Sequence, residues 1–194
     1  DEHNNIVWMY RKKEREKVLT TKQLLKRQLF VETKNRKDSK EPKRQYTYSI
    51  PLVSPIEFKH KEFDIEPYVL GYGIANGYLK KGTISSHKDD IEEIRSYICE
   101  LGYDCSDIYN VVDTNSSRFN IRGGVYKSYS ELISRTKRIP KEYFLGSIKQ
   151  RTELLKGLMD GDGSISKNGS VSYSSFNREL AEDVRDLARS LGAI

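Results

Sequence analysis

Two segments of the chain, 86 positions apart, repeat one another, and this duplication constrains the fold more than any other feature. The first runs from Val69 to Leu79 and the second from Leu155 to Ile165. Small residues recur along both at helical spacing, and such residues let two helix backbones approach closely. The matched small residues are Gly71 with Gly157, Ala75 with Gly161, and Gly77 with Gly163. The sequence therefore predicts two helices that pack side by side.

The two copies differ at one chemically important position, where Asn76 lies opposite Asp162. Each of these residues precedes a glycine, Gly77 or Gly163. A glycine just after the last turn supplies the left-handed cap that ends many helices. If the helices pack side by side, both helix ends converge, and so do residues 76 and 162. That spot is either a metal site or a pair of turns.

The repeat continues into a second pair of helices. Residues 89–102 resemble residues 178–192, and both place apolar side chains at helical spacing. The short stretches 82–87 and 169–174 are the corresponding hairpin strands after each motif. Each copy therefore has the order helix, hairpin, helix, which predicts an α+β domain with pseudo-two-fold symmetry and its special site on the axis.

On these residues the chain resembles the LAGLIDADG (dodecapeptide) homing endonucleases, whose second motif is similar to residues 154–165 and whose first motif is similar to 67–82. The resemblance implies a duplicated αββαββα fold over 61–194, with repeats at about 64–135 and 139–194, the second incomplete at its C-terminal end. It also implies a saddle of strands over double-stranded DNA, and metal-dependent phosphodiester hydrolysis at a long recognition site. Matched by position, the metal ligands are Asp162 and, where an acid is expected, Asn76.

Asn76 weakens this prediction of activity. Phosphodiester cleavage needs hard oxygen ligands that hold Mg²⁺ or another divalent cation. The amide of Asn76 offers an oxygen but no charge, so we expect a weakened endonuclease, a nickase or an inactive one. Asp160 is not expected to compensate, because two positions along a helix point about 200° apart. Nearby lysines could contact phosphate or assist water activation, namely Lys80, Lys81 and Lys167.

The best candidates for DNA contacts lie between the two repeats. Segments 107–113 and 118–122 flank Thr114–Ser117, which reads as a hairpin turn. Alternation places one set on the apolar face, namely Ile108, Val112, Phe119 and Ile121. The other face carries Tyr109, Arg118, Asn120 and Arg122. A two-stranded ribbon fits the major groove, where Arg bridges guanine and Asn bridges adenine; an ordinary solvated strand face is the alternative.

Residues 1–60 have a different character, with short strand-like stretches at 6–10 and 46–58 and a short helix over 18–30 that begins with a capping Thr. This region is similar to the N-terminal Hint (splicing) domain of inteins. The similarity implies an intein-encoded nuclease behind a partial mostly-β splicing segment, with His3 as the splicing histidine and the host exteins as partners. An exposed terminal histidine is the alternative. We expect the chain to be a fragment that does not splice alone, since no nucleophile stands at either junction.

Composition fits a DNA-associated protein. The net charge is +6 and the isoelectric point is near 9.1, which suits a polyanionic partner. We find no transmembrane run or signal-peptide pattern, so we expect an intracellular protein (cytoplasmic or nucleoid-associated) that is not secreted and has no membrane partner and no small-molecule substrate. Two further functions remain open: a catalytically inactive, maturase-like module that binds DNA or RNA, and a splicing element with a vestigial nuclease.

Overall fold

The computed structural model describes residues 5–10, 15–33, 43–49, 54–78, 81–127 and 136–193. The chain forms two compact units, Asp1–Val53 and Ser54–Ile194. The division lies seven positions before the predicted boundary at residue 60. The assignment of the units to a splicing segment and a nuclease stays a prediction.

Residues just after the division belong to the second unit because hydrogen bonds fasten them there. The Ile56 amide donates to the Ser190 carbonyl over 3.0 Å. The guanidinium of Arg151, which is fully buried, donates to the carbonyl of Ile56 and, over 2.8 Å, to that of Ser190. Gln150 also accepts a bond from the Lys61 amide and donates one to the Lys61 carbonyl. Two side chains of one helix, those of Gln150 and Arg151, thus supply hydrogen-bond partners for the backbone of this segment.

The first unit is mostly β. Strands β1 and β2 pair along their full length. Thr20 starts helix α1 with a capping box: its side chain accepts a hydrogen bond from the Gln23 amide, and the Gln23 side chain accepts one from the Thr20 amide. The predicted helix from Val18 therefore begins three residues later, because Val18 and Leu19 belong to β2. The elements are β1 (Asn5–Tyr10), β2 (Arg15–Thr20), α1 (Thr21–Leu25), β3 (Phe30–Thr33), β4 (Lys43–Tyr46) and β5 (Tyr48–Ser49), in sheets ordered β2-β1-β5 and β3-β4.

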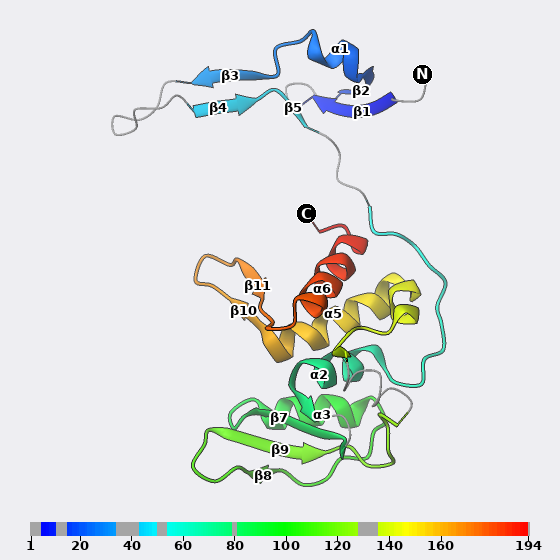
Figure 1. Ribbon diagram of the computed structural model, residues 1–194, viewed down its shortest axis with the longest axis vertical. Coiled ribbons are helices and arrows are strands. Elements are labelled where there is room, and N and C mark those ends of the chain that lie inside the picture. The colour runs from blue at the N-terminus through cyan, green and yellow to red at the C-terminus, as the bar shows by residue number, and fades with distance from the viewer. Residues whose placement is uncertain are drawn as a thin grey trace. The chain divides into compact units, whose positions relative to one another are not determined.

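The second unit has the predicted α+β architecture, with the order helix, hairpin, helix occurring twice (Figure 1). The first copy contains α2 (Pro67–Asn76), β6 (Gly77–Tyr78), β7 (Thr83–His87), α3 (Ile91–Glu100), β8 (Tyr109–Asn110) and β9 (Ser116–Asn120). The second contains the 3₁₀ helix η2 (Lys141–Leu145), α5 (Ile148–Asp162), β10 (Gly163–Ile165), β11 (Val171–Tyr173) and α6 (Arg178–Ser190). The first copy forms an antiparallel sheet ordered β6-β7-β9-β8, whereas the described part of the second forms the hairpin β10-β11.

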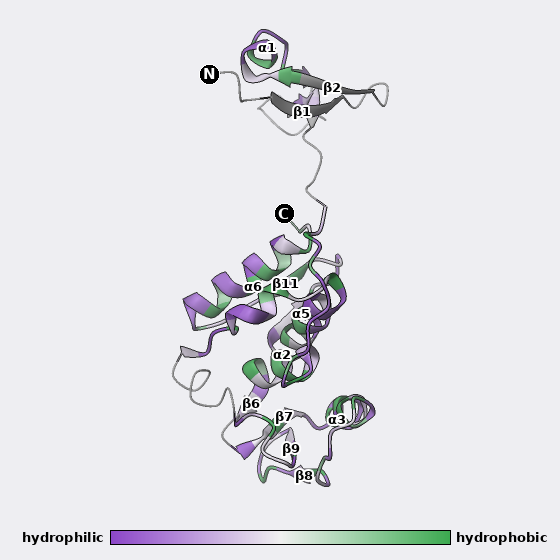
Figure 2. Cartoon of the chain, turned by 90° about the vertical axis from the view of Figure 1, so that its right-hand side faces the viewer, coloured by the Kyte–Doolittle hydropathy of each residue, from purple (hydrophilic) through white to green (hydrophobic). Residues whose placement is uncertain are grey.

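Helix α2 lies at the centre of the core. It packs against α5 on one side and against β7 on the other, and eight of its ten residues are buried. By contrast, α6 is amphipathic (Figure 2): Leu180, Val184 and Leu187 are buried, while its arginines are exposed. Among the described residues, no helix combines the length and the apolar character that crossing a membrane requires.

Two details of the predicted strands and caps are wrong. The alternation predicts Val112 on the apolar face of a strand, but this residue lies in the turn closed by the hydrogen bond from the Val111 amide to the Ser116 carbonyl, and it is 82% exposed. The other change concerns the glycines after the two motif helices. Gly77 and Gly163 are extended, with φ of −105° and −84°, rather than left-handed. Glycine is required there by space, since an added Cβ would lie 2.5 Å from the Gly73 carbonyl oxygen and 2.4 Å from that of Met159, respectively.

Candidate functional site

The site begins with the contact between α2 and α5, which is close because glycines line it. A Cβ added at Gly71 would lie 2.3 Å from the Leu154 carbonyl oxygen, and one added at Gly157 would lie 2.2 Å from that of Tyr68. Real Cβ atoms do not approach backbone so closely, so no side chain fits at either position. The predicted side-by-side packing of the motif helices is confirmed.

This packing brings the C-terminal ends of the two helices together. The side-chain amide of Asn76 donates a hydrogen bond of 2.9 Å to the carbonyl of Gly161, the residue before Asp162. Asn76 therefore satisfies one of the free carbonyls at the end of α5, and its own amide oxygen remains to accept from water or to bind a cation. An aspartate at this position could not donate this bond.

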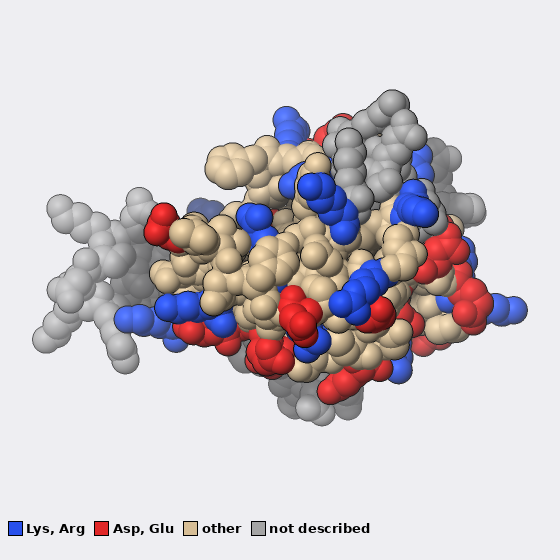
Figure 3. All heavy atoms as spheres, turned by 90° about the horizontal axis from the view of Figure 1, so that it is seen from below, with Lys and Arg blue, Asp and Glu red and all other residues tan. Residues whose placement is uncertain are grey.

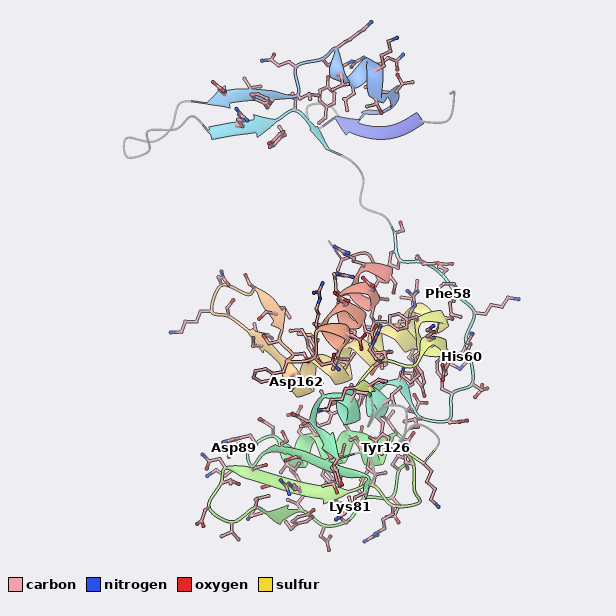
Figure 4. The ribbon with its side chains drawn as sticks, viewed as in Figure 1. Phe58, His60, Lys81, Asp89, Tyr126 and Asp162 are labelled. Atoms are coloured by element: carbon pink, nitrogen blue, oxygen red, sulfur yellow. The ribbon has the colours of Figure 1, made fainter. Side chains whose placement is uncertain are left out.

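Asp162 is half-buried where α5 meets β10 (Figure 4). Burial raises the pKa of its carboxyl group, and the ammonium of Lys137 partly opposes that rise. Tyr173, which pairs with Gly163 across the hairpin, has a buried hydroxyl with no hydrogen-bond partner among the described residues. Burial and the charge of Asp162 raise the pKa of Tyr173 to about 12. A buried hydroxyl without a partner calls for a water, an ion or a ligand.

Asp160 lies elsewhere, as its spacing from Asp162 predicted. Its carboxylate accepts a hydrogen bond of 3.0 Å from the Tyr68 hydroxyl. It lines a separate hollow between α2, α3 and α5, together with Glu93 and Lys156. The described residues contain no group of three His, Cys, Asp or Glu side chains that could hold a metal ion. A cation at the helix ends would therefore have one carboxylate, that of Asp162.

The predicted DNA-contact residues lie on one face and one end of the four-stranded sheet. Tyr109 pairs with Arg118, and Asn120 accepts a bond of 2.7 Å from Thr83 on the neighbouring strand. Phe119, by contrast, is fully buried on the face toward the helices. Arg122 follows the end of β9 and forms an ion pair of 3.0 Å with Asp104. The alternation of β9 is thus as predicted, while the role of each side chain stays a prediction.

Two of the lysines predicted near the metal site, Lys81 and Lys167, lie in separate turns. Lys81 is exposed in the β6–β7 turn, with its ammonium 5.9 Å from the centre of the Tyr78 ring. Lys167 is exposed in the β10–β11 turn, five residues beyond Asp162. Lys80 and the splicing candidate His3 lie outside the described residues. The structure thus brings Asn76 beside the end of α5, while the roles of Lys81 and Lys167 stay a prediction.

Sequence reasoning missed Lys137 and Tyr173. Tyr173 lies in the segment 169–174, which the sequence predicts as a hairpin strand. Only the strand register, with Tyr173 opposite Gly163, brings the tyrosine to the end of α5. Alternation over three residues is too short to fix that register from sequence.

Seen from the end of the molecule that carries β8 and β9, basic and acidic side chains separate in part (Figure 3). Lys and Arg predominate across the upper half of this view, whereas basic and acidic side chains are mixed across the lower half.

Comparison with known proteins adds three findings. Residues 149–194 match the model of the family described as the LAGLIDADG-like domain. A replicative DNA helicase, DnaB of Mycobacterium intracellulare, is 32% identical over 149 residues, which make up 77% of this chain and 23% of that protein. The chain thus spans about a quarter of the length of this curated relative.

Among solved structures, I-DmoI in complex with DNA and Mn is similar with a TM-score of 0.46 and 19% identity, over 66% of this chain and 78% of that one. A variant of I-DmoI with its target DNA and Mn gives the same TM-score, with 18% identity over 66% and 76% of the two chains. The family match thus falls on α5, hairpin β10-β11 and α6, which carry Asp162.

Proposed function

We propose that the unit from Ser54 onward is a LAGLIDADG-type DNA-binding nuclease domain whose cleavage activity is weakened by Asn76. The observation that carries this proposal is the meeting of two glycine-lined helices with Asn76 and Asp162 at the same end. The family match over 149–194 supports it independently of geometry. The outer face of the four-stranded sheet supplies Arg118, Asn120 and Tyr109 for contacts to double-stranded DNA.

The donor set fits a divalent cation that is weakly held and largely hydrated. Asp162 supplies one carboxylate and Asn76 one amide oxygen, and nearby lies the buried hydroxyl of Tyr173, which has no hydrogen-bond partner within the described ranges. Mg²⁺ keeps several waters and is commonly bound by one or two carboxylates plus substrate phosphates. When bound, such an ion polarises a phosphate and lowers the pKa of water. Asp162 would hold the ion, and Asn76 would orient water or bind it through the amide oxygen.

A cleavage assay tests the proposal. A library of duplex DNA is incubated with the full chain in Mg²⁺ or Mn²⁺, and nicks and double-strand breaks are counted by sequencing. We expect slow cleavage by the wild type, a rate increase of at least about tenfold for Asn76→Asp, and a loss of about 100-fold or more for Asp162→Asn. Asp160→Asn is the matched control, since Asp160 faces another hollow, and it should change the rate little.

The alternatives give distinct results in the same assay. DNA binding without cleavage by either the wild type or Asn76→Asp would favour the inactive DNA- or RNA-binding module. The absence of binding to any nucleic acid would contradict the proposal outright.

We further propose that this domain belongs to an intein, preceded by a splicing segment with His3 as its histidine. The relative named as a helicase supports this, because a strand-cleaving unit is no part of helicase chemistry and the similarity spans only 23% of that protein. Expression of the chain within its natural reading frame tests it. We expect mass spectrometry to detect the flanking sequences ligated to each other, and we expect His3→Ala to slow this ligation. An unprocessed product would contradict the intein proposal. An intracellular location follows from this proposal and is likewise to be tested.

A further inference from the structure

A hollow of about 410 Å³ lies at one end of the four-stranded sheet. It is formed by the β6–β7 turn and by the segment after β9. Its charged side chains are all basic, namely Lys81, Arg122 and Lys127. Ligand clefts in proteins commonly measure about 300–1,000 Å³, so the hollow can hold a phosphate group with part of its sugar and several waters.

The backbone of the hollow is arranged to expose N–H groups. Gly82, Gly123 and Gly124 have φ values of +65°, +82° and +67°, a left-handed conformation that glycine adopts without strain. Among the described residues, no acceptor is found for the amides of Gly123, Gly124 and Val125, whereas the amides of Arg122 and Lys127 donate to the carbonyls of Asp104 and Gly124. Successive free N–H groups in such a turn form a concavity that binds anions.

Two lysines, Lys81 and Lys127, add positive charge around this turn, whereas Arg122 is paired with Asp104. Tyr126 holds the turn in place, since its ring is buried and its hydroxyl donates 3.0 Å to the Val69 carbonyl in α2. The side chain of Lys127 lies over Gly124, where an added Cβ would be 3.0 Å from its Cε. Lys81 approaches from the β6–β7 turn (Figure 4).

We propose that this hollow binds a backbone phosphate of duplex DNA. Asn120 lines the hollow and also belongs to the outer sheet face with Arg118, so a duplex on that face would continue into it. The contact would set the register of the duplex and carry no sequence information. Gly123, Gly124 and Lys127 thereby join Lys81 and Arg122 as residues that position DNA. This inference depends on the proposed DNA-binding function.

The salt dependence of binding tests it, because each phosphate neutralised contributes about 0.9 to the slope of log K against log salt. Fluorescence anisotropy with a duplex of unrelated sequence is measured from low to high KCl. For Lys81→Gln/Lys127→Gln we expect the slope to fall by about 1 and the affinity to drop about equally on all sequences. Lys81→Arg/Lys127→Arg should keep the wild-type slope. Lys149→Gln, at the opposite end of α5, is the matched control and should leave the slope unchanged.

The outcomes separate the hollow from the function itself. If the wild type binds duplex DNA and the glutamine double variant keeps its slope, the hollow holds no DNA phosphate, while DNA binding stands. If the wild type binds no DNA, both proposals fail. Calorimetry with inorganic phosphate provides the second arm. Micromolar binding of free phosphate, lost in the glutamine variant while the DNA slope is unchanged, would assign the hollow to a small anion and overturn the proposal.

Discussion

The two motif helices are alike in their packing but differ at their ends. The end of α2 is neutral and hydrogen-bonded, since Asn76 donates to the carbonyl of Gly161. The end of α5 carries a half-buried carboxylate with a raised pKa and a nearby hydroxyl for which the described part of the chain offers no hydrogen-bond partner. One copy of the repeat thus serves the stability of the helix pair at this point, while the other keeps an unfavourable charge that function can use.

The largest expected effect concerns the close contact between α2 and α5, which both copies of the repeat share. Gly157→Ala places a Cβ 2.2 Å from the Tyr68 carbonyl oxygen and 2.8 Å from the Tyr72 amide nitrogen. Neither backbone atom can move alone, so we expect the free energy of unfolding to fall by about 3 kcal/mol or more. Chemical denaturation measures it, with Lys149→Ala on the exposed side of α5 as control. A change within about 0.5 kcal/mol, as at surface positions, would contradict the contact.

A smaller effect is expected where the copies meet through side chains. Gly161→Ala places its Cβ 2.3 Å from that of Ala75, which should cost about 2 kcal/mol. The exchange Ala75→Gly/Gly161→Ala removes the clash and leaves the summed helix propensity unchanged. We therefore expect the double variant to recover most of the wild-type stability in the same denaturation experiment. Additive losses would show that residues 75 and 161 do not touch.

The third prediction concerns a variant in which both helix ends carry an aspartate. Asn76→Asp deletes the donor to the Gly161 carbonyl and places a second carboxylate near Asp162, so the metal-free protein should lose about 1–2 kcal/mol. Thermal unfolding measures this, and added Mn²⁺ should stabilise the variant more than the wild type. Asn110→Asp is the control: its Oδ1 accepts a bond from Ser117, which an aspartate can also do. Equal stabilisation of the wild type and Asn76→Asp by Mn²⁺ would contradict the shared site.

The smallest effect is a pH dependence. Burial raises the pKa of Asp162, so the unfolded chain loses this proton at lower pH than the folded one. The folded state is therefore weakened as the pH rises from below the ordinary carboxyl pKa to above the raised one. We expect Asp162→Asn to be more stable than the wild type by about 0.3–1 kcal/mol at pH 7, with no advantage in acid. An advantage that grows as the pH falls would have the wrong sign. Asp107→Asn is the exposed control.

The sequence was sufficient to predict the duplicated helices, their glycine-lined contact and the nearness of Asn76 to the end of α5. Small residues and helical periodicity persist over many positions, so these signals are strong. The sequence was insufficient where a single turn or strand register decides the position of a side chain. Val112 lies in a turn, and the register of hairpin β10-β11 sets Tyr173 beside Gly163. The extended φ of Gly77 and Gly163 depends on the strands that follow each helix, which local capping rules ignore.

The binding of Mn²⁺ to four variants tests the central claim most directly, that residues 76 and 162 share one cation site. Affinities are measured by calorimetry for the wild type, Asn76→Asp, Asp162→Asn and the double variant. Because affinity rises with the number of charged ligands, Asn76→Asp should tighten binding about tenfold or more when Asp162 is present, and much less when residue 162 is an asparagine. An equal gain in both backgrounds would show that the two positions act independently and would contradict the shared site.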